Sequence, residues 1–223
     1  MIYAVLPAEV AAVEVFADPD DVRLFDAERA VVAGAVAKRR QEFATVRHCA
    51  RTALAQLGYP PAPLLPGRRG APQWPRGVVG SMTHCAGYRA AAVAPSARMT
   101  AIGIDAEPDE PLPAGVLNAI ARPEEVEHLA RLATTCPVGP ASGSPTSWER
   151  LLFCCKEAVF KTWYPVTGRE LGFDQASIRF RPTGRTFVAD LLIQPAAASL
   201  PRTLVGRWTI GRGLVVCAIS LPT

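Results

Sequence analysis

Proline and glycine interrupt the chain at two places, and regular structure has to fit between these interruptions. Residues 60–77 read PPAPLLPGRRGAPQWPRG, and residues 108–117 are again rich in proline. Proline lacks the backbone N–H that helices and sheets need, so helices and strands should stop at both segments. We expect the second segment to be a hinge between an N-terminal half, residues 1–107, and a C-terminal half, residues 108–223.

Apolar spacing and end signals predict four helices. The longest covers about residues 36–57, where apolar side chains recur at every third or fourth position, and Gly58 with the prolines after it ends the helix. The other three are a helix capped by Asp20 or Asp21, an acidic helix that begins at Pro123, and a helix that runs from a Thr146–Glu149 capping box to about Tyr164, before Pro165 and Gly168.

Short β-like runs make up most of the remaining chain. They are residues 1–16 (one strand or two), 78–84, 88–94, 100–107, 172–180, 186–193, 205–210 and 214–221. The last two runs flank Gly211-Arg212-Gly213 and predict a hairpin. Residues 134–147 are predicted to form a flexible loop. The mixture indicates an α+β fold, each half having a helix or two packed on a small, mostly antiparallel sheet.

The charges are unevenly distributed along the chain. Residues 30–104 contain ten lysines and arginines and only one acid, Glu42, whereas residues 105–130 contain seven acids and only one arginine, Arg122. The basic segment suits an anionic ligand such as a phosphate, and the acids after it could hold a hard cation. Two solvated surfaces of opposite sign would give the same pattern, and composition alone favours that interpretation.

Several classes of protein are excluded by composition and motifs. No apolar run approaches the ~18 residues of a membrane span, and the N-terminus lacks the basic start of a secretory signal. The six cysteines form no C-x-x-C pair, so we expect neither a zinc site nor a disulfide framework, and predict a cytoplasmic protein with buried thiols. No phosphate-binding or dinucleotide-binding glycine motif occurs, and no serine-hydrolase elbow surrounds Ser81.

Two carboxylates lie close together in the segment GIDAEP. Asp105 and Glu107 are two residues apart at the end of an apolar run, so both side chains point to the same face if the run is a strand. Two like charges at that spacing repel unless a proton or cation lies between them. A Mg²⁺ site completed by substrate phosphates and a solvated pair at a strand end are equally compatible with this spacing.

Three further residues have both a structural and a chemical interpretation. Glu157 and Lys161 have the spacing of a surface ion pair on a helix, but they could also supply a third carboxylate and a phosphate contact. His84 ends a strand in the basic half, where a phosphate contact is credible although a lone histidine is more often structural.

Together these segments resemble a known family. GIDAEP followed by CCKEAVFK is similar to the paired signature of the Sfp-type 4′-phosphopantetheinyl transferases. Upstream, KRRQEFATVRHCAR, LLPGRRGAPQWP and VVGSMTHCAGYRAAAVA resemble the actinobacterial branch, which includes the mycobacterial type II enzyme. The resemblance runs from about residue 38 to residue 173 and joins five segments in order.

The resemblance implies a fold, a reaction and partners. The fold would be two similar α+β halves related by a pseudo-twofold axis, with coenzyme A in the cleft between them. The enzyme would use Mg²⁺, or Mn²⁺, to transfer the phosphopantetheine arm of coenzyme A to a serine of apo acyl or peptidyl carrier proteins, with 3′,5′-ADP as the leaving group. We expect a cytoplasmic monomer that binds neither nucleic acid nor membrane.

The resemblance also implies roles for individual residues. The metal ligands would be Asp105, Glu107 and Glu157, with Glu157 also the general base. The lysines near the pyrophosphate would be Lys156 and Lys161, and the residues at the coenzyme A phosphates would be Arg39, Arg47, Arg69, Thr83 and His84. In LLPGRRG, Pro66 stands where relatives often have a lysine, so Arg69 is expected to take over its contact.

Two other functions are weighed against this one. A non-catalytic coenzyme A or nucleotide binder of the same fold is disfavoured because all three acids and both motif lysines are present. An RNA-binding module using the basic segment is disfavoured because aromatic residues are sparse there and the acids at 105 and 107 would repel a phosphate backbone.

Overall fold

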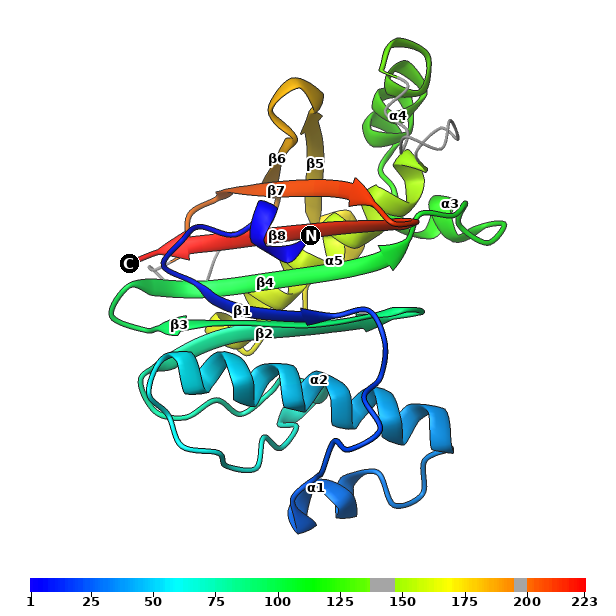
Figure 1. Cartoon of the computed structure of the whole chain (residues 1–223). Coiled ribbons are helices and arrows are strands. Elements are labelled where there is room, and N and C mark those ends of the chain that lie inside the picture. Colours follow the sequence, from blue (N-terminus) through cyan, green and yellow to red (C-terminus); the bar gives the residue numbers. More distant parts are fainter. Residues whose placement is uncertain (137–146, 195–199) are drawn as a thin grey trace.

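The computed structural model describes residues 1–136, 147–194 and 200–223, and contains two antiparallel sheets (Figure 1). The first sheet has the strand order β1 (Ala11–Val15), β3 (Tyr88–Pro95), β2 (Val78–Cys85). The second has the order β4 (Met99–Pro108), β8 (Leu214–Pro222), β7 (Thr203–Gly211), β6 (Thr186–Leu191), β5 (Ala176–Arg181). The predicted α+β class is confirmed.

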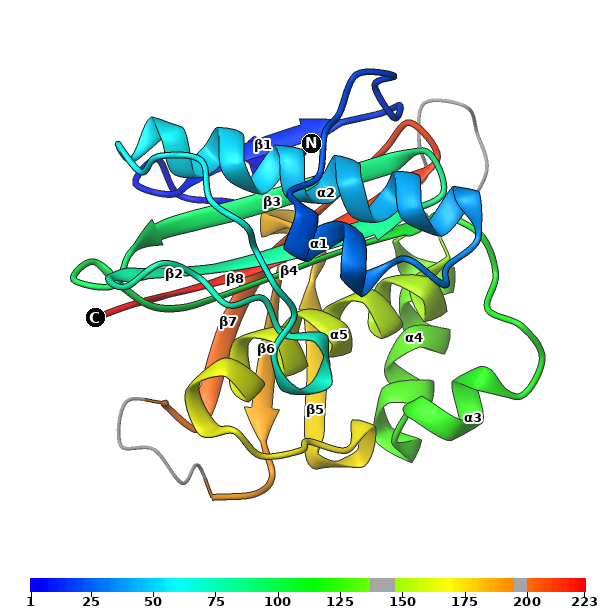
Figure 2. The ribbon, with the colours of Figure 1, turned by 90° about the horizontal axis from the view of Figure 1, so that it is seen from below.

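Two long helices pack against these sheets. Helix α2 (Ala37–Gln56) packs on β1 and β3, and α5 (Trp148–Thr167) packs on β4 and β8. Figure 2 shows the two helices on opposite sides of β2 and β4. The shorter helices are α1 (Asp26–Val31), α3 (Val116–Ile120) and α4 (Pro123–Thr135), and 3₁₀ turns cover Ile2–Ala4, Arg68–Gly70, Phe173–Gln175 and Pro182–Gly184. None of the helices in the described part of the chain has the length and apolarity to cross a bilayer.

The two halves share an order of elements. In the first, the chain runs β1, α2, β2, β3, and β3 lies between β1 and β2. In the second, it runs β4, α5, β7, β8, with an extra pair of strands, β5 and β6, inserted between α5 and β7. Strand β8 lies between β4 and β7. This matching order supports two similar halves. Because β4 is the first strand of the second unit, we propose that the C-terminal half begins near residue 99, one strand earlier than the predicted boundary.

The sheets meet where β2 and β4 lie side by side, and side-chain hydroxyls connect these two strands. The Ile104 N–H donates to Ser81 Oγ at 3.1 Å, and the Ala106 N–H donates to Thr83 Oγ1 at 3.2 Å. These two N–H groups of β4 are thereby satisfied, as buried amides require. This seam of hydroxyl contacts positions α2 and α5 on either side of one cleft.

Some local predictions were wrong. No helix starts at Asp20 or Asp21; α1 starts at Asp26, and its first turn is fixed by the Phe25 N–H donating to the Glu28 carboxylate at 3.0 Å. Within residues 1–16 one of the expected strands is present as β1, whereas Ile2–Ala4 form a 3₁₀ turn. The predicted loop at 134–147 lies mostly outside the described residues.

Helix α5 differs from its prediction at both ends. Its N-cap is Ser147, whose hydroxyl accepts from the Arg150 N–H at 3.2 Å. At the other end, Pro165 lies within the last turn, and the helix continues to Thr167. Gly168 then adopts φ +63°, a left-handed conformation that glycine tolerates and that commonly ends helices.

Gly103 allows α5 to lie directly on β4. A Cβ at this position would lie 2.1 Å from the Ala158 carbonyl oxygen and 2.2 Å from Thr162 Oγ1. We expect Gly103→Ala to push the helix away from the strand and to lower the free energy of unfolding by about 1–3 kcal/mol. Urea denaturation measures this loss, and Gly34→Ala, where a Cβ meets no atom within 4 Å, is the matched control. Equal stability of the two variants would contradict this view of the contact.

Candidate active site

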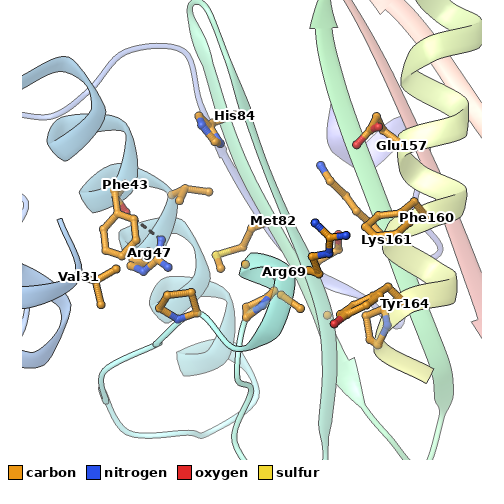
Figure 3. Close-up of a pocket in the computed structure, with 18 of the residues that line it drawn as sticks. Val31, Phe43, Arg47, Arg69, Met82, His84, Glu157, Phe160, Lys161 and Tyr164 are labelled. Atoms are coloured by element: carbon orange, nitrogen blue, oxygen red, sulfur yellow. Dashed lines mark hydrogen bonds between the residues drawn. The ribbon is translucent and has the colours of Figure 1, made fainter. Parts of the chain in front are cut away.

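A cavity of about 510 Å³ lies between α2 and α5. Its basic lining residues are Arg39, Arg47, Arg69, His84 and Lys161. Apolar residues complete the walls, among them Phe43 and Met82 in the first half and Phe160 and Tyr164 on α5. Figure 3 shows Phe43 and Arg47 on α2 across the cavity from Phe160, Lys161 and Tyr164 on α5. The cavity therefore joins the two halves and combines positive charge with apolar surface.

Arg47 is a fixed cation in the cavity wall. Arg47 Nε donates a hydrogen bond to the Leu64 carbonyl oxygen at 2.9 Å. The guanidinium also makes a cation–π contact, 3.2 Å from the Phe43 ring centroid. The residue is only 5% exposed, and this burial lowers the pKa of Arg47 to about 10. Arg47 therefore stays charged at neutral pH, and its rigid hold reduces the entropy lost when an anion binds.

Arg39 and His84 meet at the same wall, although 45 positions separate them in the sequence. An Arg39 guanidinium nitrogen contacts His84 Nε2, and the Glu42 carboxylate lies 3.9 Å from each of these nitrogens. Burial, and then the charge of Arg39, lower the pKa of His84, so the imidazole is neutral at pH 7. An incoming anion can therefore form hydrogen bonds with both Arg39 and His84.

Arg69 lines the cavity with a side chain that is largely exposed. It lies in the 3₁₀ turn of the proline-rich loop with φ +56°, an uncommon conformation for a residue other than glycine. Its guanidinium pairs with Glu170, which follows α5, so the contact joins the two halves. Pro66, the departure from the family pattern, also lines the cavity and pairs with Pro72 in an isolated β-bridge.

Asp105 is a buried carboxylate beside this cavity. One oxygen, Oδ1, accepts from Lys161 Nζ at 2.6 Å and from Thr83 Oγ1 at 3.0 Å. The other oxygen, Oδ2, is buried and has no hydrogen-bond partner among the described residues. Such an unsatisfied buried carboxylate oxygen is costly, and a bound cation would relieve that cost.

The other two acids are influenced by Asp105. Burial, and then the charge of Asp105, raise the pKa of Glu107 to about 7, although Arg150 lies 3.2 Å from its carboxylate. The same two causes raise the pKa of Glu157. Burial opposes the charge on Lys161, but its ion pair with Asp105 outweighs this effect and raises the lysine pKa. The three carboxylates therefore share one electrostatic environment.

A divalent cation fits this environment. Among the described residues, no three acidic, histidine or cysteine side chains are already gathered as a metal-ligand set. The unsatisfied oxygen of Asp105 and the repulsion among the three acids nevertheless favour a cation. Mg²⁺ commonly uses one or two carboxylates and completes its shell with substrate phosphates and water, so a preformed set of three is not required.

Lys156 was expected at the pyrophosphate, but its ammonium is directed elsewhere. Nζ lies 2.8 Å from the Glu125 carboxylate and donates to the carbonyl oxygens of Phe173 at 2.6 Å and Ala176 at 3.0 Å. The residue is 3% exposed and borders a separate pocket of about 180 Å³. Lys156 thus ties α5 to α4 and β5 and does not line the large cavity, and its phosphate contact stays a prediction.

Thr83 also differs from its expected position. It was predicted to contact a phosphate beside His84, but it is buried at 2% exposure and its hydroxyl contacts β4. Met82 and His84, its neighbours in the strand, line the cavity while Thr83 does not. The structure therefore gives Thr83 contacts with Asp105 and Ala106 instead of access to a ligand in the cavity.

Two charged residues that support the site, Arg150 and Arg89, were not predicted from the sequence. Arg150 holds Glu107 and also donates to the carbonyl oxygens of Glu110 and Pro111. Arg89, which is buried, approaches Glu42 at 3.6 Å. No local signal in the sequence predicts either contact, because each depends on how separate elements pack.

Comparison with known protein families shows to which family the chain belongs. The model of the 4′-phosphopantetheinyl transferase N-terminal domain matches residues 27–94, and the model of the 4′-phosphopantetheinyl transferase superfamily matches residues 101–212. The chain belongs to the 4′-phosphopantetheinyl transferase superfamily. The resemblance found in the sequence is confirmed. The break between the two matches, residues 95–100, contains the turn between β3 and β4.

Individual relatives cover nearly the whole chain. The 4′-phosphopantetheinyl transferase Svp of Streptomyces mobaraensis is 53% identical over 226 residues, covering 99% of this chain and 89% of the relative. PptT of Mycobacterium tuberculosis is 48% identical, covering 99% and 98%, and Npt of Nocardia iowensis is 45% identical, covering 99% of both chains. The chain is therefore a phosphopantetheinyl transferase, an enzyme that transfers the phosphopantetheine arm of coenzyme A to carrier proteins.

Proposed function

We propose that this transferase modifies a serine of apo acyl or peptidyl carrier proteins in a Mg²⁺-dependent reaction that takes place in the cleft between α2 and α5. The observation that carries the proposal is the contact between Lys161 and Asp105, which joins the basic cavity to the acidic cluster. Phosphates and a divalent cation could thus meet at one place. We also propose that the enzyme acts as a cytoplasmic monomer.

Coenzyme A would bind with its phosphates against the basic wall of the cavity. Arg39, Arg47 and His84 supply hydrogen-bond donors there, and Arg69 also lines the cavity. Guanidinium groups suit phosphate because they form paired, charge-assisted hydrogen bonds. The apolar walls around Phe160 suit the uncharged parts of the same ligand.

The residues that would hold Mg²⁺ are Asp105, Glu107 and Glu157, and Mn²⁺ could take the same place. When bound, the metal would neutralise charge that develops on the pyrophosphate oxygens. The Lys161 ammonium, kept protonated by Asp105, adds positive charge at the cavity side of the cluster.

The chain's own groups account for the proton transfer. The serine oxygen of the carrier would attack the β-phosphorus of coenzyme A, the bond from this phosphorus to the bridging oxygen would break, and 3′,5′-ADP would leave with the bond electrons. The serine proton would pass to the Glu157 carboxylate, directly or through water. The raised pKa of Glu157 makes it a stronger proton acceptor than an ordinary glutamate.

Metal binding should depend on pH through Glu107. Its pKa of about 7 means that the metal-free protein carries a proton there at lower pH, which the metal has to displace. We expect Mg²⁺ affinity to increase as the pH rises from about 6 to about 8, with proton release below about pH 7. Titration calorimetry in two buffers of different ionisation enthalpy measures both effects. Glu107→Gln should bind more weakly and lose this dependence, and equal wild-type affinity at both pH values would contradict the assignment.

Intact-mass spectrometry of a carrier protein tests the proposed reaction. The enzyme is incubated with an apo carrier, coenzyme A and Mg²⁺, and in parallel with a chelator. A mass gain of one phosphopantetheine arm that the chelator abolishes is the expected result. A gain that survives the chelator would contradict the metal dependence, and coenzyme A binding without a gain on any of several unrelated carriers would indicate a non-catalytic binder.

A further inference from the structure

We propose that Thr83 is a positioning residue that acts through Asp105. This inference rests on the proposed function, because it assigns Thr83 to the metal-binding side of the same site. Thr83 lies on β2 in the first half, whereas Asp105 lies on β4 in the second half. The contact between them therefore crosses the junction of the two halves.

The Thr83 hydroxyl has a defined orientation. A threonine hydroxyl has one hydrogen to donate and two lone pairs to accept with. The Ala106 N–H donates to Oγ1 at 3.2 Å, which fixes the oxygen against the β4 backbone. The hydroxyl hydrogen is then directed to Asp105 Oδ1 at 3.0 Å. The Thr83 hydroxyl thus accepts a hydrogen bond from the β4 backbone and donates one to Asp105.

This contact determines which Asp105 oxygen remains available. Oδ1 is occupied by Thr83 and Lys161, while Oδ2 has no partner in the described part of the chain. The terminal torsion of an aspartate is broad and nearly two-fold, so the carboxylate needs outside contacts to hold one orientation. Thr83 supplies such a contact from a buried position, so Oδ2 is kept free to bind a cation.

The test compares Thr83→Val, which keeps the shape and removes the hydroxyl, with Thr83→Ser, which keeps the hydroxyl. Mn²⁺ binding is measured by electron paramagnetic resonance, and kcat and the KM for coenzyme A are measured in carrier modification. Loss of an outer contact of this kind typically costs about 10- to 100-fold in metal affinity or activity. We expect Thr83→Val to lose this much Mn²⁺ affinity and kcat with little change in KM for coenzyme A, and Thr83→Ser to recover most of both.

Thr45→Val is the matched control, because Thr45 is a fully buried threonine on α2 whose hydroxyl has no partner among the described residues. It should leave Mn²⁺ binding and transfer near wild type. Higher KM for coenzyme A in Thr83→Val with unchanged Mn²⁺ affinity would overturn the inference in favour of direct ligand contact. An equal loss in Thr83→Ser would also overturn it. A wild-type protein that modifies no carrier would overturn the proposed function, while the Mn²⁺ measurements would still decide the role of Thr83.

Discussion

Asp105→Asn is expected to lower kcat/KM for carrier modification by about 10³-fold, the scale of losing one preorganised electrostatic group. The substitution keeps the size of the side chain but removes the negative charge that pairs with Lys161 at 2.6 Å. It also replaces one of two oxygens by an amide nitrogen, which cannot ligate a cation. Steady-state kinetics with an apo carrier measures the effect.

Coenzyme A binding separates this loss from a general disruption of the site. Asp105 is 4% exposed and does not line the cavity, so affinity for coenzyme A without metal should change little. Glu127→Gln removes an acid of α4 whose ion pair with Arg131 is exposed, and serves as the control. Asp105→Asn activity within about ten-fold of wild type would contradict the central role of this carboxylate.

Lys156→Met is expected to lower the free energy of unfolding by about 3–5 kcal/mol. The change leaves the Glu125 carboxylate as an uncompensated buried charge, and the carbonyl oxygens of Phe173 and Ala176 lose their donor. Urea denaturation measures the loss. Where the variant is folded, its KM for coenzyme A should remain close to wild type, because the ammonium does not reach the basic wall of the cavity.

A double variant tests the physical cause of this loss. Glu125→Gln removes the buried charge and keeps an oxygen for the Ile178 N–H, which donates to the Glu125 carboxylate at 2.7 Å. The double variant Lys156→Met with Glu125→Gln should therefore be more stable than Lys156→Met alone. A single variant of wild-type stability with a much higher KM for coenzyme A would restore the predicted phosphate contact.

The different positions of the two motif lysines follow from helix geometry. Lys156 and Lys161 are five residues apart, which on an α-helix separates them by about 140° around the axis. They therefore lie on different faces of α5, whereas Glu157 and Lys161, four residues apart, share one face and both line the cavity. The family pattern assigned one chemical role to both lysines, and the helical periodicity available in the sequence argues against it.

Local signals predicted the elements well where one short segment was sufficient. Gly58 and the prolines after it end α2 as expected, and the hairpin turn at Gly211–Gly213 joins β7 and β8. The role of Thr83 could not be found in this way, because it depends on which edge strands of the two sheets meet. Arg39 and His84 likewise come together only through packing of α2 against the first sheet.

A crystal structure with coenzyme A and Mn²⁺, in which the anomalous signal locates the metal, tests the proposed site between α2 and α5. We expect coenzyme A in the cavity between α2 and α5, with its phosphates near Arg39 and Arg47 and the metal peak at Asp105 Oδ2. Coenzyme A outside this cavity, or a metal peak away from Asp105, would contradict the proposed site.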